Sequence, residues 1–298
     1  MNFAASDRPQ HGQGGAAHRF AHDAMACTFE LYLVGVGARY ARQAAEAAFE
    51  EVDRLEQLLS RFIPHSDIGQ INALQPGSAI RVSPETIECL QLAAEVHQQT
   101  GGAFDIAFHS QPRIGPDGPS PLIFDPTQSA IGVQRTGVVL DLGAIGKGYA
   151  VDRVAALLRE WKIPAALVHS GQSTVYALGR PPTGDAWRLT LRSPDEQGDA
   201  LGTLALTDEA LSGSGQRLHG GHIRDPRTGA PATAYSATWA VASSAAVSDA
   251  LSTAFMLLTP AEVATVCGRQ RDVSGILRPT TAQTGRELLC FGRHQPGT

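Results

Sequence analysis

The sequence predicts an α+β fold, in which mixed sheets and packed helices form a single compact body. Residues 27–34 have the composition of a strand, and residues 38–60 follow with apolar positions at helical spacing. Polar and apolar residues alternate between 187 and 206, a pattern typical of antiparallel strands. The chain contains no internal repeat and no linker long enough to require a domain boundary, so these elements are expected to share one core.

Composition and charge exclude several classes of protein. The 298 residues include 24 Lys and Arg against 29 Asp and Glu, a formal net charge of -5 that argues against a polybasic protein of nucleic acids or membrane surfaces. Hydrophobic residues make up 43% of the chain, enough to bury a large core. The most apolar stretch, 237–258, is interrupted by Ser243, Asp249 and other polar residues, so no transmembrane helix is expected.

The N-terminal residues 1–22 are predicted to form a disordered polar tail, and residues 23–298 to form the folded domain. Residues 1–19 are rich in Gly, Gln, His and Ala and lack the basic start and apolar segment of a secretory signal. The chain as given is therefore expected in the cytoplasm, or in the periplasm or anchored to a membrane if an export segment has been removed. The four cysteines are widely spaced and include no CxxC pair that could bind zinc or exchange disulfides. Most of them are therefore expected to be buried thiols.

The first half of the chain is expected to begin with a strand and a helix, at 27–34 and 38–60. Ser83 followed by Pro84 is typical of the start of a second helix, which Gly101-Gly102 ends after about residue 99. A segment rich in Pro and Gly at 111–126 predicts an exposed loop.

The second half is expected to add further strands and two helices. In addition to the antiparallel strands within 187–206, strands are predicted at 137–142, 165–169, 237–242, 275–277 and 287–291. The helices are predicted at 149–161 and 245–258. Asp249 and Thr253 lie four residues apart in the second of these helices, so they share one face.

A glycine-rich turn at 143–148 lies between a predicted strand and a predicted helix. Consecutive backbone amides and a helix N-terminus make such a turn a natural phosphate site. It is not a P-loop, because only two residues separate Gly143 from Gly146 and Gly148 stands where a P-loop has Ser or Thr. Taken alone, the motif favours a tight structural turn.

Three other segments allow both a structural and a functional interpretation. Residues 100–105 are consistent with a simple helix C-cap. Residues 222–229 place an imidazole, two guanidinium groups and a carboxylate beside a Pro-x-x-Gly turn, which is either a functional loop or an exposed turn with an Asp cap. Asp249 and Thr253 interrupt an apolar helix, where an unpaired carboxylate is costly unless it meets a partner or a cation. A metal site is one hypothesis for this pair, and an Asp at the solvent end of the helix is the other.

Seven segments, taken in order, carry more information than any single motif. They are Met25-Ala26-Cys27-Thr28-Phe29-Glu30, 60–72, 100–105, 141–152 (DLGAIGKGYAVD), Ser212-Gly213, 222–229 and 249–253. In this order and spacing, over about residues 24–258, the chain resembles the ApbE family of flavin transferases. The resemblance implies an ApbE-like, T-fold-related domain.

The resemblance also implies a function, that of an FAD:protein FMN transferase. Such an enzyme uses Mg²⁺ to transfer the FMN moiety of FAD to a Thr or Ser hydroxyl of an acceptor flavoprotein and releases AMP. It further implies FAD contacts from Met25, Phe62, Gly102, Ala103, Phe104, Asp105, Asp141, Lys147 and His222. The implied metal ligands are the backbone oxygen of Ala144 and the side chains of Asp249 and Thr253, oxygen donors that suit a hard cation.

Two other functions stay open on the sequence alone. Water in place of the acceptor hydroxyl would make the protein a Mg²⁺-dependent FAD diphosphatase, and loss of transfer would leave a non-catalytic FAD-binding protein. The sequence departs from the family pattern at 25–27, where Met-Ala-Cys replaces Met-Gly-Thr, and at 169–173, where His-Ser-Gly-Gln-Ser replaces Asn-x-Gly-Gly-Asp. The catalytic residues are expected to be Asp249, committed to Mg²⁺, and His222, which is favoured as the base for the acceptor hydroxyl.

Overall fold

The fold is built around one antiparallel sheet of eight strands. A computed structural model gives the structure and describes residues 4–5, 17–111, 120–125, 127–182, 184–193, 198–215, 223–281 and 287–297. The strands of the large sheet lie in the order β14-β13-β12-β11-β8-β7-β3-β2. Their bounds are β2 His18–Ala24, β3 Cys27–Val34, β7 Ala165–Ser170, β8 Thr174–Gly179, β11 Glu209–Gly215, β12 Tyr235–Ala242, β13 Ser274–Pro279 and β14 Leu289–Phe291.

Two small sheets and a set of helices complete the described chain. One small sheet has the order β1-β9-β10 and the other the order β4-β6-β5. Their strands are β1 Ala4–Ala5, β9 Trp187–Arg192, β10 Ala200–Leu206, β4 Ala79–Arg81, β6 Ala130–Val133 and β5 Leu122–Asp125. The helices are α1 Ala38–Leu59, α2 Asp67–Asn72, α3 Pro84–Gln99, α4 Gly146–Glu160, α5 Ala245–Phe255 and α6 Pro260–Arg269.

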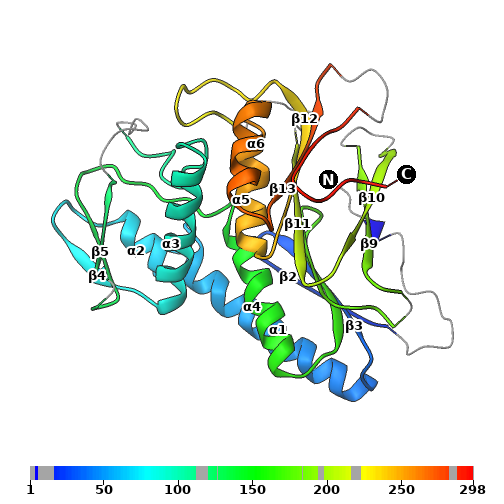
Figure 1. The fold of residues 1–298 in the computed structure, drawn as a ribbon. Helices are drawn as coiled ribbons and strands as arrows, with labels where there is room; N and C mark the ends of the chain where they lie inside the picture. Colours follow the sequence, from blue (N-terminus) through cyan, green and yellow to red (C-terminus); the bar gives the residue numbers. More distant parts are fainter. Residues whose placement is uncertain are drawn as a thin grey trace.

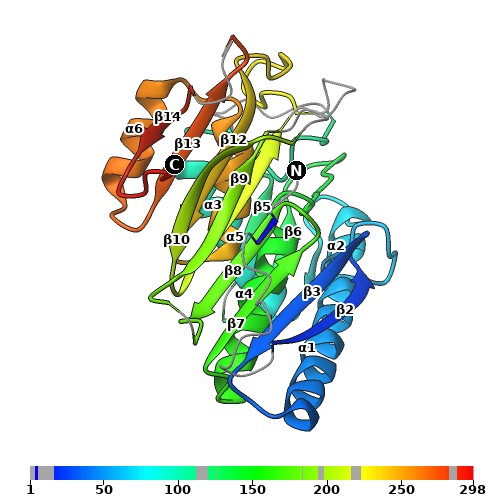
Figure 2. The ribbon, with the colours of Figure 1, turned by 90° about the vertical axis from the view of Figure 1, so that its right-hand side faces the viewer.

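The large sheet lies between a layer of helices and a small sheet. Figure 1 shows α1, α4 and α5 beside one face of the large sheet, with β9 and β10 on the other side. Figure 2 shows β9 and β10 in front of the large sheet, with the helices behind it. Along β12, Ala240 and Ala242 belong to the core on the helix side, and Trp239 and Val241 to the core between the two sheets. A strand buried on both faces has an almost continuous apolar sequence, as β12 does.

Of the other elements, α2, α3 and the β4-β6-β5 sheet stand beside the helix layer (Figure 1). Residues at the end of α3 and in β5 share a cavity with Leu140, which lies in the connection that precedes α4. None of the helices in the described ranges is both long enough and apolar enough to cross a membrane.

Several sequence predictions are confirmed by this architecture. Strand β3 has the predicted bounds, and α1 ends one residue before the predicted end. Ser83 caps α3 by accepting a hydrogen bond from the amide of Thr86, with Pro84 at the first helical position. The alternation within 187–206 forms the antiparallel pair β9 and β10.

The strand predicted at 137–142 is wrong. This segment buries Leu140, but none of the described strands pairs with it; instead, the side-chain amide of Asn72 exchanges two hydrogen bonds with the Leu140 backbone, at 2.7 and 3.0 Å. The backbone of Asp141 donates to the carbonyl of Ile106 at 2.8 Å. Contacts with a loop and a side chain therefore replace the expected ladder.

Several predicted boundaries also differ from the structure. Helix α4 begins at Gly146 rather than 149, and α5 ends at Phe255 rather than 258, because a new helix is capped at Thr259. Strand β5 lies inside the loop predicted at 111–126, of which residues 112–119 and 126 are outside the described ranges. Strand β2 takes residues 18–22 from the predicted tail, because seven residue pairs join it to β3 in a hairpin.

Candidate active site

The turn at 143–148 is held by its own polar groups and leads directly into α4. The carboxylate of Asp141 accepts a hydrogen bond from the amide of Gly143 at 2.8 Å, and the ammonium of Lys147 donates to the carbonyl of Gly143 at 2.6 Å. No side chain of the turn caps the N-terminus of α4. Instead, the amide of Gly148 donates to Oδ2 of Asp249, on α5, at 3.2 Å. The start of α4 and the middle of α5 therefore meet.

Asp249 is a buried carboxylate, with 5% of its surface exposed. Burial raises its pKa, and the charge of Lys147, the Gly148 amide and the Thr174 hydroxyl oppose that shift. No ion pair of Asp249 is found within the described ranges, so its charge is only partly compensated. This is the environment in which a bound cation would be favourable. The alternative interpretation of Asp249 as a solvent-facing helix residue is wrong.

Thr253 lies one turn further along α5 and faces β11. Its hydroxyl oxygen is 3.2 Å from Oγ of Ser214, which in turn is 2.9 Å from Oγ of Ser252. Ser212, also on β11, donates to Thr174 at 3.2 Å. The surroundings of Asp249 and Thr253 are therefore rich in hydroxyl oxygens.

The donors present fit a hard cation. Asp249 and Thr253 supply one carboxylate and one hydroxyl, and no group of three or more His, Cys, Asp and Glu residues able to hold a metal occurs in the part of the chain that the structure describes. A site of this kind leaves most coordination positions to backbone oxygens, water and substrate phosphate, which is the usual way in which proteins bind Mg²⁺.

The β2–β3 hairpin turn approaches the same place from another side. Met25 and Ala26 form the turn with φ values of 50° and 57°, and the Met25 amide donates to a carboxylate oxygen of Glu56 at 3.0 Å. Cys27 is half-buried, and burial raises the pKa of its thiol, with Lys147 lowering and Asp249 raising it in smaller measure. The hairpin is thus within electrostatic reach of both charged groups.

The exposed aromatic ring of Phe62 is connected to Asp141 through Arg61. The guanidinium of Arg61 is 4.5 Å from the centre of the Phe62 ring, and 79% of the Phe62 surface is exposed. Nε of Arg61 lies 3.2 Å from Oδ2 of Asp141, and Nε2 of His109 lies 3.6 Å from the same oxygen. The guanidinium of Arg61 therefore links the largely exposed Phe62 ring to Asp141, at the start of the glycine-rich turn.

The turn after α3 is both a helix cap and a wall of a cavity. Gly102 has a φ of 79°, which favours glycine, and its amide donates to the carbonyl of His97 at 2.9 Å. Ala103 and Phe104 are buried, and Oδ1 of Asp105 accepts from the amide of Ala107 at 2.8 Å. Gly102 and Asp105 line the cavity, but Ala103 and Phe104 do not.

This cavity has a volume of about 460 Å³ and a largely apolar lining. Its walls are α3 from Leu90 onward, residues 101, 102 and 105–107, residues 120–122 and 124, Leu140 and the pair Pro226-Arg227. Nδ1 of His97 donates to the carbonyl of Phe104 at 2.8 Å, which leaves Nε2 of the neutral ring as an acceptor. The cavity adjoins the site at 143–148, because Asp141 directly follows Leu140 in the chain.

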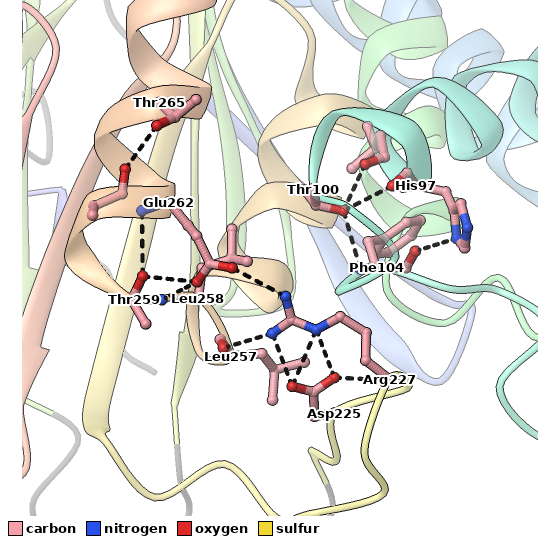
Figure 3. A network of polar contacts seen from close by, with 12 residues as sticks. His97, Thr100, Phe104, Asp225, Arg227, Leu257, Leu258, Thr259, Glu262 and Thr265 are labelled. Carbon is pink, nitrogen blue, oxygen red and sulfur yellow. Dashed lines mark hydrogen bonds and ion pairs between the residues drawn. The ribbon is translucent and has the colours of Figure 1, made fainter. Parts of the chain in front are cut away.

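Arg227 lines this cavity and anchors its loop through a network of polar contacts, which Figure 3 shows. Its guanidinium donates to both oxygens of Asp225, to Glu262 on α6 at 3.3 Å and to the carbonyl of Leu257 at 3.2 Å. The Asp225 carboxylate also accepts from the amide of Arg227 at 2.8 Å, so the structural interpretation holds for this Asp. His222 lies outside the described residues.

The sequence matches a model of the ApbE family over residues 25–277. This chain belongs to the ApbE family. The match contains the hairpin turn, the turn at 143–148 and the pair on α5, which the fold brings together.

Relatives of this ApbE protein are FAD:protein FMN transferases. One from Klebsiella pneumoniae is 29% identical over 218 residues, which are 63% of this chain and 66% of that protein, slightly less than two thirds of its length. One from Escherichia coli K12 is 26% identical over 271 residues, covering 79% of this chain and 77% of that protein.

Solved ApbE structures have the same fold. The flavin transferase ApbE from Vibrio cholerae has a TM-score of 0.78 at 17% identity and covers 95% of this chain and 98% of that chain. The apo flavinyl transferase ApbE from Pseudomonas stutzeri has a TM-score of 0.75 at 22% identity, covering 93% and 94%.

Several residues at the site of this ApbE chain escaped the sequence analysis. They are Arg61, His109, Thr174 and Ser214. The segment 60–72 contained a signal for Arg61, since it precedes the predicted Phe62. No local pattern marked Thr174 or Ser214. They lie on β8 and β11, and they reach α5 only because the sheet places these two strands side by side.

Proposed function

We infer that this protein is an FAD:protein FMN transferase. In this reaction the oxygen of an acceptor Thr or Ser hydroxyl bonds to the phosphorus on the FMN side of FAD. The phosphoanhydride bond breaks, AMP leaves with its phosphate, and the hydroxyl proton passes to a base or to water. The observation that supports this function most directly is the contact between the glycine-rich turn and Asp249. The amide of Gly148 donates a hydrogen bond of 3.2 Å to the buried carboxylate of Asp249.

We propose that Mg²⁺ is held at this place by Asp249, Thr253 and the backbone oxygen of Ala144. A bound Mg²⁺ would neutralise charge that develops on the diphosphate oxygens. Support comes from the burial of Asp249, from the lack of an ion-pair partner for it among the described residues, and from the oxygen-only donor set. Lys147, held 2.6 Å from the Gly143 carbonyl, supplies a second positive charge beside the turn.

The two ring systems of FAD have different requirements. The isoalloxazine leaves attached to a protein, so it must remain near the surface, and the exposed face of Phe62 suits stacking with it. Adenine leaves as part of AMP, and the largely apolar cavity of about 460 Å³ suits an enclosed ring. We therefore propose that flavin lies at Phe62 and adenine in the cavity beside Gly102 and Asp105.

Product analysis tests the proposed function. The purified protein would be incubated with FAD, Mg²⁺ and a candidate acceptor, and the products would be followed as protein-bound FMN, free FMN and AMP. Transfer predicts equal amounts of protein-bound FMN and AMP, both lost on chelation of Mg²⁺. Free FMN with AMP in the presence of a competent acceptor would indicate a diphosphatase, and intact FAD a binding protein.

His222 is proposed as the base for the acceptor hydroxyl. A general base typically contributes about 10²- to 10⁴-fold to a rate, and phosphoryl transfer depends mainly on positioning and charge neutralisation. The His222→Asn variant should therefore bind FAD and transfer FMN slowly, with part of the deficit recovered at higher pH. Wild-type rates of this variant between about pH 6 and pH 9 would assign the proton to water or another group.

A further inference from the structure

Helices α4 and α5 cap each other through two carboxylates. Asp249, on α5, accepts from the amide of Gly148 near the start of α4 at 3.2 Å. Asp152, on α4, accepts from the amides of Ala245 and Ala246 at the start of α5, at 2.6 and 2.9 Å. The earlier residue of α4, Gly148, contacts the later residue of α5, Asp249, and the later residue of α4, Asp152, contacts the first residues of α5. The two helices therefore run antiparallel where they touch.

Asp152 satisfies the first backbone donors of α5 together with Ser244. The hydroxyl of Ser244 donates to Oδ2 of Asp152 at 2.7 Å and accepts from the amide of Val247 at 3.3 Å. The amides of the first three residues of α5 therefore all have partners. Helix N-termini leave such amides without an intrahelical acceptor, so this arrangement fixes the position and direction of the helix start.

Gly148 lets the two backbones touch between these carboxylates. A Cβ at this position would lie 2.3 Å from the carbonyl oxygen of Ala245 and 2.8 Å from Cα of Ala246. Asp249 lies four residues after Ala245, a rise of about 6 Å along the helix. A displacement at the start of α5 is therefore passed directly to the carboxylate of Asp249.

We propose that Asp152 is a positioning residue for the metal site, acting through α5 on the side chains of Asp249 and Thr253. The inference rests on the proposed function, because it takes these two side chains as metal ligands. Asp152 touches neither of them, and its role is to hold the helix that carries both. Removal of a residue that is hydrogen-bonded directly to a metal ligand typically weakens metal affinity by about 10- to 100-fold. Asp152 acts one step further away, so we expect an effect at the lower end of this range.

A matched control exists in the same molecule. Oδ2 of Asp67 accepts from the amide and hydroxyl of Ser83 and from the hydroxyl of Thr86, at 2.7 to 2.8 Å, at the start of α3. Asp67→Asn thus removes the same kind of carboxylate from a helix start that carries neither proposed ligand. In Asp152→Asn, the side-chain NH₂ group must face backbone N–H donors, which breaks part of the cap.

The test measures binding of Mn²⁺ alone to the metal-free proteins by electron paramagnetic resonance. Asp152→Asn should raise the Kd for Mn²⁺ by about tenfold, and Asp67→Asn should leave it unchanged. In the transfer reaction, the half-saturating Mg²⁺ concentration of Asp152→Asn should rise in parallel, with kcat largely recovered at saturating Mg²⁺. An unchanged Kd, or a loss of kcat without a change in half-saturation, would overturn the proposal.

A second measurement needs no metal. The amide of Gly148 should exchange with solvent deuterium faster in metal-free Asp152→Asn than in the wild type or in Asp67→Asn, because Asp249 moves away from it. Unchanged exchange at Gly148 would contradict the positioning role whatever the protein's activity. Absence of both Mn²⁺ binding and FMN transfer in the wild type would instead contradict the proposed function.

Conservative variants cover the case in which Asp152→Asn does not fold. Ser244→Ala removes one hydrogen bond of the same cap and should weaken Mn²⁺ binding in the same direction by a smaller factor. Asp152→Glu keeps the charge and should restore affinity at least in part. Wild-type affinity in Ser244→Ala, together with a folded but non-binding Asp152→Glu, would contradict the proposal.

Discussion

The carboxylate of Asp249 accepts a hydrogen bond at 3.2 Å from the amide of Gly148, a residue 101 positions earlier in the chain. This contact joins two segments that the sequence could only treat as separate motifs. It places a buried negative charge at the N-terminus of α4, where amides and the helix dipole favour anions. In the free protein, the carboxylate of Asp249 therefore faces the positive end of the α4 helix dipole. A cation bound beside Asp249 would neutralise the negative charge of this carboxylate.

Asp249→Asn should stabilise the metal-free protein at pH 7 and abolish FMN transfer. Burial raises the pKa of Asp249 above its unfolded value, so the folded state disfavours the ionised form. That penalty is absent at low pH, where the carboxyl is protonated in both states, and grows as the pH rises through the two pKa values. The Tm difference between variant and wild type should thus increase from about pH 3 to pH 7. A variant less stable than the metal-free wild type at pH 7 would contradict this account of the site.

Lys147→Met should weaken the binding of FAD without changing the binding of riboflavin. The ammonium lies beside the glycine-rich turn, 2.6 Å from the Gly143 carbonyl, and riboflavin has no phosphate for it to contact. Hydrogen bonds to charged groups contribute about 1.5–3 kcal/mol, so the loss in FAD affinity should be about 10- to 150-fold. Fluorescence titration measures both ligands, and Lys162→Met, at an exposed position, is the control. Equal losses for FAD and riboflavin would mean that the diphosphate lies elsewhere.

Phe62→Ala should weaken flavin binding at almost no cost in stability. The ring is 79% exposed, and surface substitutions usually change the free energy of unfolding by less than about 0.5 kcal/mol. Riboflavin and FAD should both bind more weakly, whereas AMP should bind as before. Leu289→Ala, which truncates another exposed apolar residue at the far edge of the large sheet, should change none of these affinities. Unaltered riboflavin binding in Phe62→Ala would place the isoalloxazine away from this ring.

His169 should make the protein less stable in acid. It is 5% exposed, its ring packs edge-on against Tyr32, and Nε2 has no hydrogen-bond partner within the described chain. Burial lowers the pKa of His169 to about 4. The folded state therefore favours the neutral ring. The protein keeps its full free energy of unfolding above the unfolded pKa of about 6.5 and loses part of it as the pH falls toward 4, because the unfolded state then binds the proton more readily.

The expected size of this effect is at most about 3 to 4 kcal/mol, since the pKa is lowered from 6.5 to about 4 and one pKa unit corresponds to about 1.4 kcal/mol. Thermal unfolding of His169→Gln should show a weaker dependence on pH between about 6.5 and 4 than the wild type does. His65→Gln, at an exposed position, should follow the wild type. Parallel pH profiles of the wild type and His169→Gln would show that His169 is not the titrating group.

Elements with strong local signals could be predicted from the sequence. The apolar spacing within α1 and the pair Ser83-Pro84 at the start of α3 each act over a few residues, so they needed no tertiary information. The segment 137–142 failed because its backbone partner is the side chain of Asn72, 68 residues away, and not a strand. Strand β11, rich in Gly and Ser, has little β-propensity and is fixed by its neighbours β8 and β12.

The candidate site was predictable in part, for the same reason. Asp249 and Thr253 could be placed on one helix face from their spacing, but their approach to Gly148 depends on the packing of α4 against α5. The cavity combines α3, β5 and the pair Pro226-Arg227, three segments without a common motif. Its closure depends on Arg227 reaching Glu262 on α6, a contact between residues 35 positions apart.

The most direct test of the central claim is a crystal structure of the protein with FAD and Mn²⁺, with Mn²⁺ located by anomalous scattering. We expect one Mn²⁺ between the diphosphate and α5, bound by Asp249, Thr253 and the backbone oxygen of Ala144, with the diphosphate against the turn at 143–148. The flavin should lie at Phe62 and the adenine in the cavity beside Gly102. An Mn²⁺ ion away from Asp249, or a diphosphate away from this turn, would contradict the account.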